Sequence, residues 1–123
     1  MLVIRAEQMQ ALSKVQAKAF EDRMVAHIQE FFPDHHAAMK EDGARELIHL
    51  GIERAARYGI IAERDVCMYI EMMIAFGPDY DESARLSWAG RMLRNPTYTN
   101  PSEKMEAVHR TGLEYLRQPA GKR

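Results

Sequence analysis

The sequence predicts an all-α protein: a single-domain bundle of about five helices around a central apolar helix at residues 60–76. Three observations lead to this fold class. Apolar residues recur at steps of three and four along most of the chain. No stretch alternates apolar and polar residues as a strand would, and proline or glycine separates the helical stretches. The 123 residues suit one domain, which we assign to residues 1–117, followed by a flexible basic tail at residues 118–123.

The first helix is expected over residues 5–32, after a short apolar lead-in at residues 2–4. Pro33 ends it and can open a short next turn, and the following segment is expected to be a connector with one or two helical turns. Asp42 is a plausible N-cap for the second helix, because its carboxylate can accept hydrogen bonds from free backbone N–H groups. That helix should end near Tyr58, where Gly59 can take a left-handed conformation.

The central helix, residues 60–76, is apolar on nearly every side. A surface helix would be polar on one side, but here that side carries Met68, Tyr69, Met72 and Phe76. Such a helix is either buried among its neighbours or covered by a partner, and both interpretations stay open. It is too short to span a bilayer, which needs about 20 apolar residues. Gly77 and Pro78 should end it.

Two further helices complete the bundle. The first is expected over residues 82–94, with Trp88 anchoring it to the core. The second and central helices are joined by a very short turn, so these two are expected to be antiparallel neighbours. The last helix should begin at Asn100, Pro101 and Glu103, which supply a capping side chain, a proline for the first turn and an early acid. We expect it to run to residue 117.

Composition excludes several classes of function. Seventeen basic and eighteen acidic residues give a net charge of −1, without the basic excess typical of nucleic-acid binders. Nothing at the N-terminus resembles a signal peptide, and no stretch could cross a membrane. Cys67 is the single cysteine, so no intramolecular disulfide can form and a cytoplasmic location is expected.

The sharpest chemical pattern is a pair of Glu-x-x-His motifs, Glu46 with His49 and Glu106 with His109. Helical bundles that hold two metal ions use such motifs, so an enzyme or sensor with a dimetal carboxylate site is an alternative. Both pairs, however, face away from the apolar stripes of their helices, whereas metal ligands in a bundle must point inward. Cys67 lies on an apolar face and is expected to be an inert buried thiol. We expect no catalytic residue and no cofactor.

Protein binding is the favoured function. Methionine-rich surfaces adapt to varied partners, and aromatic anchors with a polar rim are the usual pattern of interfaces. We predict that a protein partner contacts the second face of the central helix. The expected anchors are Met68, Tyr69, Met72 and Phe76, and the expected rim is Asp79, Tyr80 and Asp81. A homodimer formed through the same face is an alternative.

Four segments carry a resemblance to a known family: FEDRMVAHIQEFFP, GIERAARYGI, AERDVCMYIEMMIAFGPDYD and LSWAGRML. Together with the long opening helix, they make residues 1–95 similar to small helical proteins of bacteria that are often encoded beside type VI secretion spike and effector genes. The family has no catalytic motif to carry over. The resemblance implies an accessory role, as an adaptor or chaperone for a secreted effector, or as an immunity protein that neutralises a toxin.

Overall fold

The computed structural model describes residues 14–119, and these residues form an all-α bundle, as predicted. The lead-in at residues 2–4, the first part of the predicted opening helix and most of the predicted tail lie outside this range. No helix in the described range has the length and apolar character needed to cross a membrane. The elements are α2 (Lys14–Phe31), α3 (Pro33–Ala56), α4 (Glu63–Phe76), the 3-10 helix η1 (Tyr80–Glu82), α5 (Ser87–Arg94) and α6 (Pro101–Arg117).

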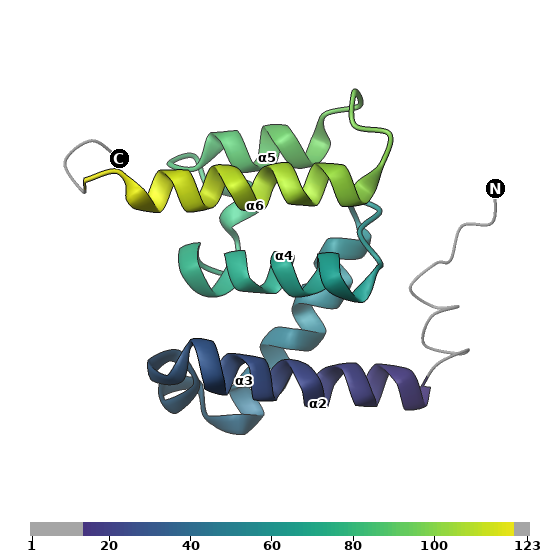
Figure 1. Ribbon diagram of the computed structural model, residues 1–123, viewed down its shortest axis with the longest axis vertical. Helices are drawn as coiled ribbons and strands as arrows, with labels where there is room; N and C mark the ends of the chain where they lie inside the picture. Colours follow the sequence, from purple (N-terminus) through teal and green to yellow (C-terminus); the bar gives the residue numbers. More distant parts are fainter. Residues whose placement is uncertain (1–13, 120–123) are drawn as a thin grey trace.

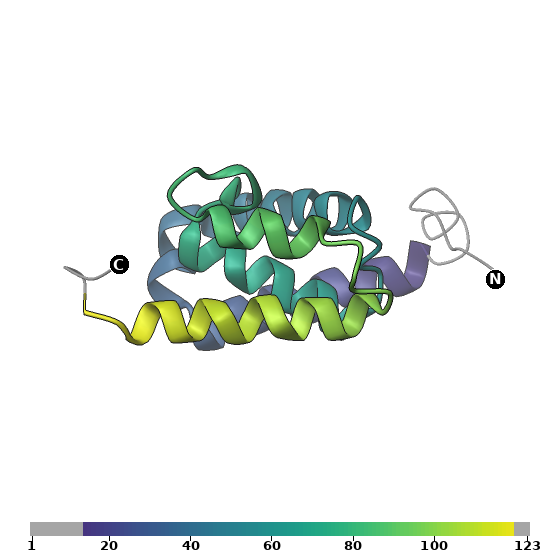
Figure 2. The same ribbon diagram turned by 90° about the horizontal axis from the view of Figure 1, so that it is seen from above.

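Helix α4 occupies the middle of the bundle. In Figure 1 it lies between α2 on one side and α6 on the other, and α5 packs beside α6. Helix α3 crosses obliquely behind α4 and runs in roughly the opposite direction, which Figure 2 shows from above. The central position expected for this helix is therefore confirmed.

The core is built around α4 with side chains from α2, α3, η1, α5 and α6. Burying such apolar side chains stabilises the fold by about 25 cal/mol for each Å² removed from water. Its largest side chains come from every described helix and include aromatic residues from both α4 and η1. Those with less than 2% exposure are Tyr69, Tyr80, Met24, Ile28, Ile48, Ile60, Ile70, Met73, Leu86, Leu93, Met105 and Val108.

The segment after Pro33 was expected to be a connector with one or two helical turns, and it is helical from Pro33 onward. Proline fits the first turn of a helix, and the alanines that follow favour continuation. A kink at Lys40, with φ 63° and ψ 175°, separates this first segment from the rest of α3. The second segment thus starts close to where a helix start was predicted, but its non-helical residue is Lys40, so the predicted cap at Asp42 is wrong.

The other helix ends follow local chemistry. The Asn100 side chain accepts hydrogen bonds from the backbone N–H groups of Ser102 and Glu103, which confirms the predicted cap of α6. Gly59 and Gly77 both have positive φ, at 77° and 106°. Gly77 has ψ 152°, so it turns the chain without the left-handed helical geometry that was expected. Helix α5 begins at Ser87, later than predicted, because η1 takes up residues 80–82.

Candidate functional site

The predicted partner-binding face of α4 is only partly exposed. Tyr69 and Met72 are buried, with 0% and 3% exposure, whereas Met68 and Phe76 are half-buried. The prediction of exposed anchors is therefore wrong for Tyr69 and Met72. The reason is that both residues are covered by elements later in the chain, which the helical pattern of α4 alone could not reveal.

Helix α6 and the aromatic side chains near it provide much of this cover. Gly112 brings α6 so close to α4 that a Cβ atom there would lie 2.5 Å from Cε of Met72. Phe76 packs edge-on against both Trp88 and Tyr115, with ring centroids 6.0 Å and 5.7 Å away. Tyr69 packs against Tyr80 at 5.2 Å. The second face of α4 is thus mainly an internal contact.

The predicted acidic rim makes contacts within the fold that hold the loop after α4 in place. Tyr80 and Asp81 are buried and only Asp79 is exposed, so the rim prediction is wrong for the first two. Tyr58 donates a hydrogen bond to the Asp81 carboxylate, and Arg54 pairs with Asp79 while donating to the Pro78 carbonyl. Burial, together with the Asp81 carboxylate, raises the pKa of Tyr58 to about 12. These contacts tie the loop after α4 back to α3.

The open part of α4 lies beside α6, where the two helices border a surface hollow of about 350 Å³. Two leucines of α6 are exposed there or one turn away, with Leu113 at 43% and Leu116 at 42%. The hollow combines apolar side chains with charged ones. It is lined by Arg64, Met68, Glu106, His109, Arg110, Leu113, Glu114 and Arg117.

Charges around the hollow are unevenly paired. Arg64 forms an ion pair with Glu106 at 3.0 Å. Among residues 14–119, Arg110 and Arg117 take part in no ion pair. Two guanidinium groups at the edge of an apolar hollow favour a ligand that brings negative charge next to apolar surface.

The two Glu-x-x-His motifs do not converge on one place. On α3, Glu46 is exposed and His49 contacts the Glu21 carboxylate of α2. On α6, Glu106 pairs with Arg64, while His109 points to Glu71 of α4 instead. The dimetal site predicted as an alternative from these four residues is therefore not assembled.

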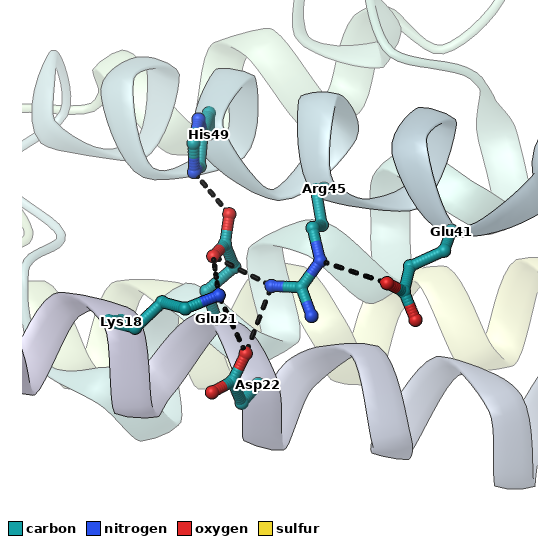
Figure 3. A network of polar contacts seen from close by, with 6 residues as sticks. All are labelled: Lys18, Glu21, Asp22, Glu41, Arg45 and His49. Atoms are coloured by element: carbon teal, nitrogen blue, oxygen red, sulfur yellow. Dashed lines mark hydrogen bonds and ion pairs between the residues drawn. The ribbon is translucent and has the colours of Figure 1, made fainter.

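His49 belongs to a polar network that joins α2 to α3 (Figure 3). Its centre is Glu21, which is 7% exposed and whose carboxylate accepts a hydrogen bond from Arg45 at 2.8 Å. Arg45 also donates to Asp22 at 2.9 Å. Burial acts to raise the pKa of Glu21, but the neighbouring His49 and Arg45 outweigh it and lower the pKa. The network is a structural link between two helices.

A second polar cluster centres on Glu71 and joins three helices. His27 Nε2 of α2 lies 3.0 Å from one Glu71 oxygen, and His109 Nε2 of α6 lies 3.4 Å from the other. Cys67 is one turn before Glu71 on α4, and its Sγ lies within 4.8 Å of both the His27 and the Glu71 donor atoms. Burial, aided by the Glu71 carboxylate, raises the pKa of Cys67 to about 11.

This cluster was missed by the sequence analysis. The four-residue spacing of Cys67 and Glu71 places both on one face of a helix, which was an available signal. His27, at the border of the apolar stripe of its helix, gave none, because its partner is 44 residues away in the chain.

Comparison with known proteins gives no assignment for this chain. No family model matches it, and neither a curated protein nor a solved structure does.

Proposed function

We propose that this chain is a small protein-binding module whose partner places an acidic, amphipathic helix against the hollow between α4 and α6. The observation that carries the proposal is the composition of that hollow: Met68 and Leu113 lie beside Arg110 and Arg117, whose charges are unpaired within residues 14–119. Protein binding was also predicted from the sequence, but the binding surface proposed here lies on the open side of α4 and not on its covered side.

The apolar part of the surface suits a helix. Leu113 and Leu116 are three residues apart on α6, so they are neighbours on its surface, and both expose more than two fifths of their area. Met68 of α4 lines the other side of the same hollow, and a methionine side chain adapts its shape to an incoming residue. A partner helix can meet such a groove with apolar residues at positions i, i+3, i+4 and i+7.

The charged part selects the partner. Arg110 and Arg117 flank the apolar side chains on α6, where they can reach carboxylates on the polar border of a docked helix. Glu106 and Glu114 also line the hollow, and the whole chain has a net charge of −1. The hollow therefore lacks the basic stripe that a phosphate backbone needs, and a protein segment that places a few carboxylates beside Arg110 and Arg117 is the better fit.

The biological class of partner follows from the resemblance found in the sequence. Similarity to small helical proteins encoded beside type VI secretion genes supports a secreted effector as the partner, with this chain as its cytoplasmic adaptor or chaperone. Neutralisation of a toxin by an immunity protein would use the same kind of surface. The two roles differ in whether the bound effector stays active, which an activity assay of the complex would decide.

The test is capture of partners by the full-length chain from extracts of its own cells, with the bound protein identified by mass. We expect one stoichiometric partner, with binding weakened at least about tenfold by Arg110→Glu and by Leu113→Asp. Arg91→Glu on α5 is the matched control, because Arg91 is also exposed but does not line the hollow. All three variants should keep the helical circular dichroism of the wild type.

Three results would overturn the proposal. A partner that binds both groove variants as tightly as the wild type would dock elsewhere. A partner segment that is basic, or that is extended when bound, would contradict the acidic helix. A concentration-dependent dimer in sedimentation that is abolished by Leu113→Asp would instead assign the hollow to a second copy of this chain.

A further inference from the structure

We propose that His27, Cys67 and Glu71 form a binding site for a divalent transition-metal ion of the zinc class. His109 holds the other oxygen of the Glu71 carboxylate. The proposal is independent of partner binding, because three of these four residues do not line the hollow between α4 and α6.

The spacing of the donor atoms fits a metal ion. Tetrahedral ligation with bonds of about 2.0–2.3 Å places ligand atoms roughly 3.3–3.8 Å from one another. His27 Nε2 and the nearer Glu71 oxygen are 3.0 Å apart, and Cys67 Sγ lies within 4.8 Å of both. Small rotations of these side chains would therefore bring the three donors to ligand distance without moving the helices.

The donors select the class of ion. A thiolate, an imidazole and a carboxylate together match Zn²⁺, whereas Mg²⁺ and Ca²⁺ prefer oxygen ligands alone. Three protein ligands leave a fourth position for water or an external ligand. The site can be reached from solvent, because the His27 and Glu71 side chains are 28% and 23% exposed.

The surroundings orient the ligands. The imidazole of His27 packs on Phe31, with ring centroids 4.7 Å apart, so its ring plane is restricted. His109 Nε2 lies 3.4 Å from the Glu71 oxygen that would not bind the ion. A side chain in this position orients a carboxylate ligand from outside the ligand set. A bound ion would join α2 to α4, and through His109 it would be coupled to α6.

The experiment is titration of the purified, metal-free, full-length chain with Zn²⁺ and with Co²⁺ as a spectroscopic probe. We expect one ion per chain, a rise in the thermal midpoint, and visible absorption bands of tetrahedral Co²⁺ with a thiolate-to-metal charge-transfer band. Cys67→Ser should abolish the charge-transfer band. His109→Gln should weaken binding by about 10–100-fold, because His109 only orients a ligand. His27→Gln and Glu71→Gln should weaken binding by more than that, because each removes a ligand.

His35→Gln is the matched control, since His35 is exposed at the start of α3 and apart from the cluster. It should leave both affinity and spectrum unchanged. The proposal fails if the wild type binds neither ion, or if the Cys67→Ser chain keeps the cobalt spectrum. It also fails if His35→Gln weakens binding as much as His27→Gln, since that pattern indicates general surface chelation. Partner capture by the Cys67→Ser chain should be unaffected.

Discussion

Helix α4 has two sides that differ in what surrounds them. On the side toward α3 and η1, Tyr69, Ile70 and Met73 have at most 1% exposure and are held by close packing. On the side between α2 and α6, Met68 and Glu71 remain partly exposed, and polar side chains span the gap. Burial on the first side supplies stability that lets the second side stay partly exposed.

Two carboxylates make the same contrast at atomic level. Asp81 is 4% exposed and accepts a hydrogen bond from Tyr58, in a loop that is tied to the core. Glu71 is met by two histidines from different helices, at a place that solvent can reach. A protonated phenol group can donate a hydrogen bond to a carboxylate but is a poor metal ligand. An imidazole can pair with a carboxylate and can also bind a metal ion. The first arrangement is structural, and the second is suited to a ligand.

The largest expected effect separates two adjacent residues of α4. Tyr69→Ala should destabilise the fold by about 3–5 kcal/mol, because it empties the space of a fully buried ring. Met68→Ala should cost about 1 kcal/mol or less, because Met68 borders the open hollow. Urea denaturation followed by circular dichroism would measure both. Equal losses at the two positions would contradict the difference between the sides of α4.

Gly51 of α3 and Gly112 of α6 lie where these two helices pack against α4. At Gly51 of α3 an added Cβ would lie 2.4 Å from Cγ1 of the buried Ile70, which has no room to move. At Gly112 of α6 it would meet the terminal methyl of Met72 at 2.5 Å, which can rotate away more easily. Overpacking costs about 1–3 kcal/mol, and helix propensity returns about 1 kcal/mol.

We therefore expect Gly51→Ala to be net destabilising and Gly112→Ala to be nearer to neutral. Thermal melts of the two variants would show the order. If Gly112→Ala proves the more harmful change, α6 is packed on α4 as rigidly as α3 is, and the open side is narrower than we infer.

The third prediction concerns α2, one wall of the open side. Arg45→Met should lower the thermal midpoint at pH 7, because Glu21 and Asp22 lose their guanidinium partner. The pKa of Glu21 is lowered in the folded chain from its ordinary value of 4.5. The Glu21 carboxylate therefore stabilises the fold at pH values above 4.5, and this contribution is lost as the pH falls below 4.5 and through the lowered pKa. The difference between variant and wild type should therefore shrink in acid. A difference that is the same at pH 7 and in acid would contradict the role of this network.

The last effect is expected in alkali, on the closed side of α4. Burial raises the pKa of Tyr58 to about 12 from 10.0, and burial also raises the pKa of Tyr69 and Tyr80. The unfolded chain loses tyrosine protons near pH 10 while the folded chain keeps them, so stability should fall as the pH rises from about 10 toward 12.

Denaturation of the Cys67→Ser chain would measure this fall without the thiol, whose raised pKa acts in the same direction. In a chain that also carries Tyr98→Phe and Tyr115→Phe, tyrosinate absorbance that develops near pH 10, before the chain unfolds, would show that the hydroxyls of Tyr58, Tyr69 and Tyr80 are not protected.

The sequence predicts the helices well where local chemistry decides. The cap at Asn100, the turn at Gly59 and the central position of α4 all follow from residues near to one another in the chain. It fails where a distant element decides. Tyr69 and Met72 were interpreted as part of a second exposed face, because the elements that cover them, η1 and α6, come later in the chain. The helix that starts at Pro33 was expected to last only one or two turns, because its segment is rich in turn-forming residues.

The candidate sites depend still more on distant contacts. Met68 was predicted as an anchor and does line the hollow, but Leu113 and Arg110 come from a helix that the pattern of α4 could not place beside it. His27 reaches Glu71 across 44 residues. A pattern within one helix tells which residues share a face, and only the packed bundle tells what that face meets.

Photo-cross-linking in living cells would test most directly whether the open side of α4 is the binding surface. A photoreactive residue is placed at position 113 in one chain and at position 91 in another, and the adducts are identified by mass. We expect one partner protein, joined through an acidic helical segment, at position 113 only. The same adduct from position 91, or none at 113 while the partner still co-purifies, would show that the partner binds elsewhere.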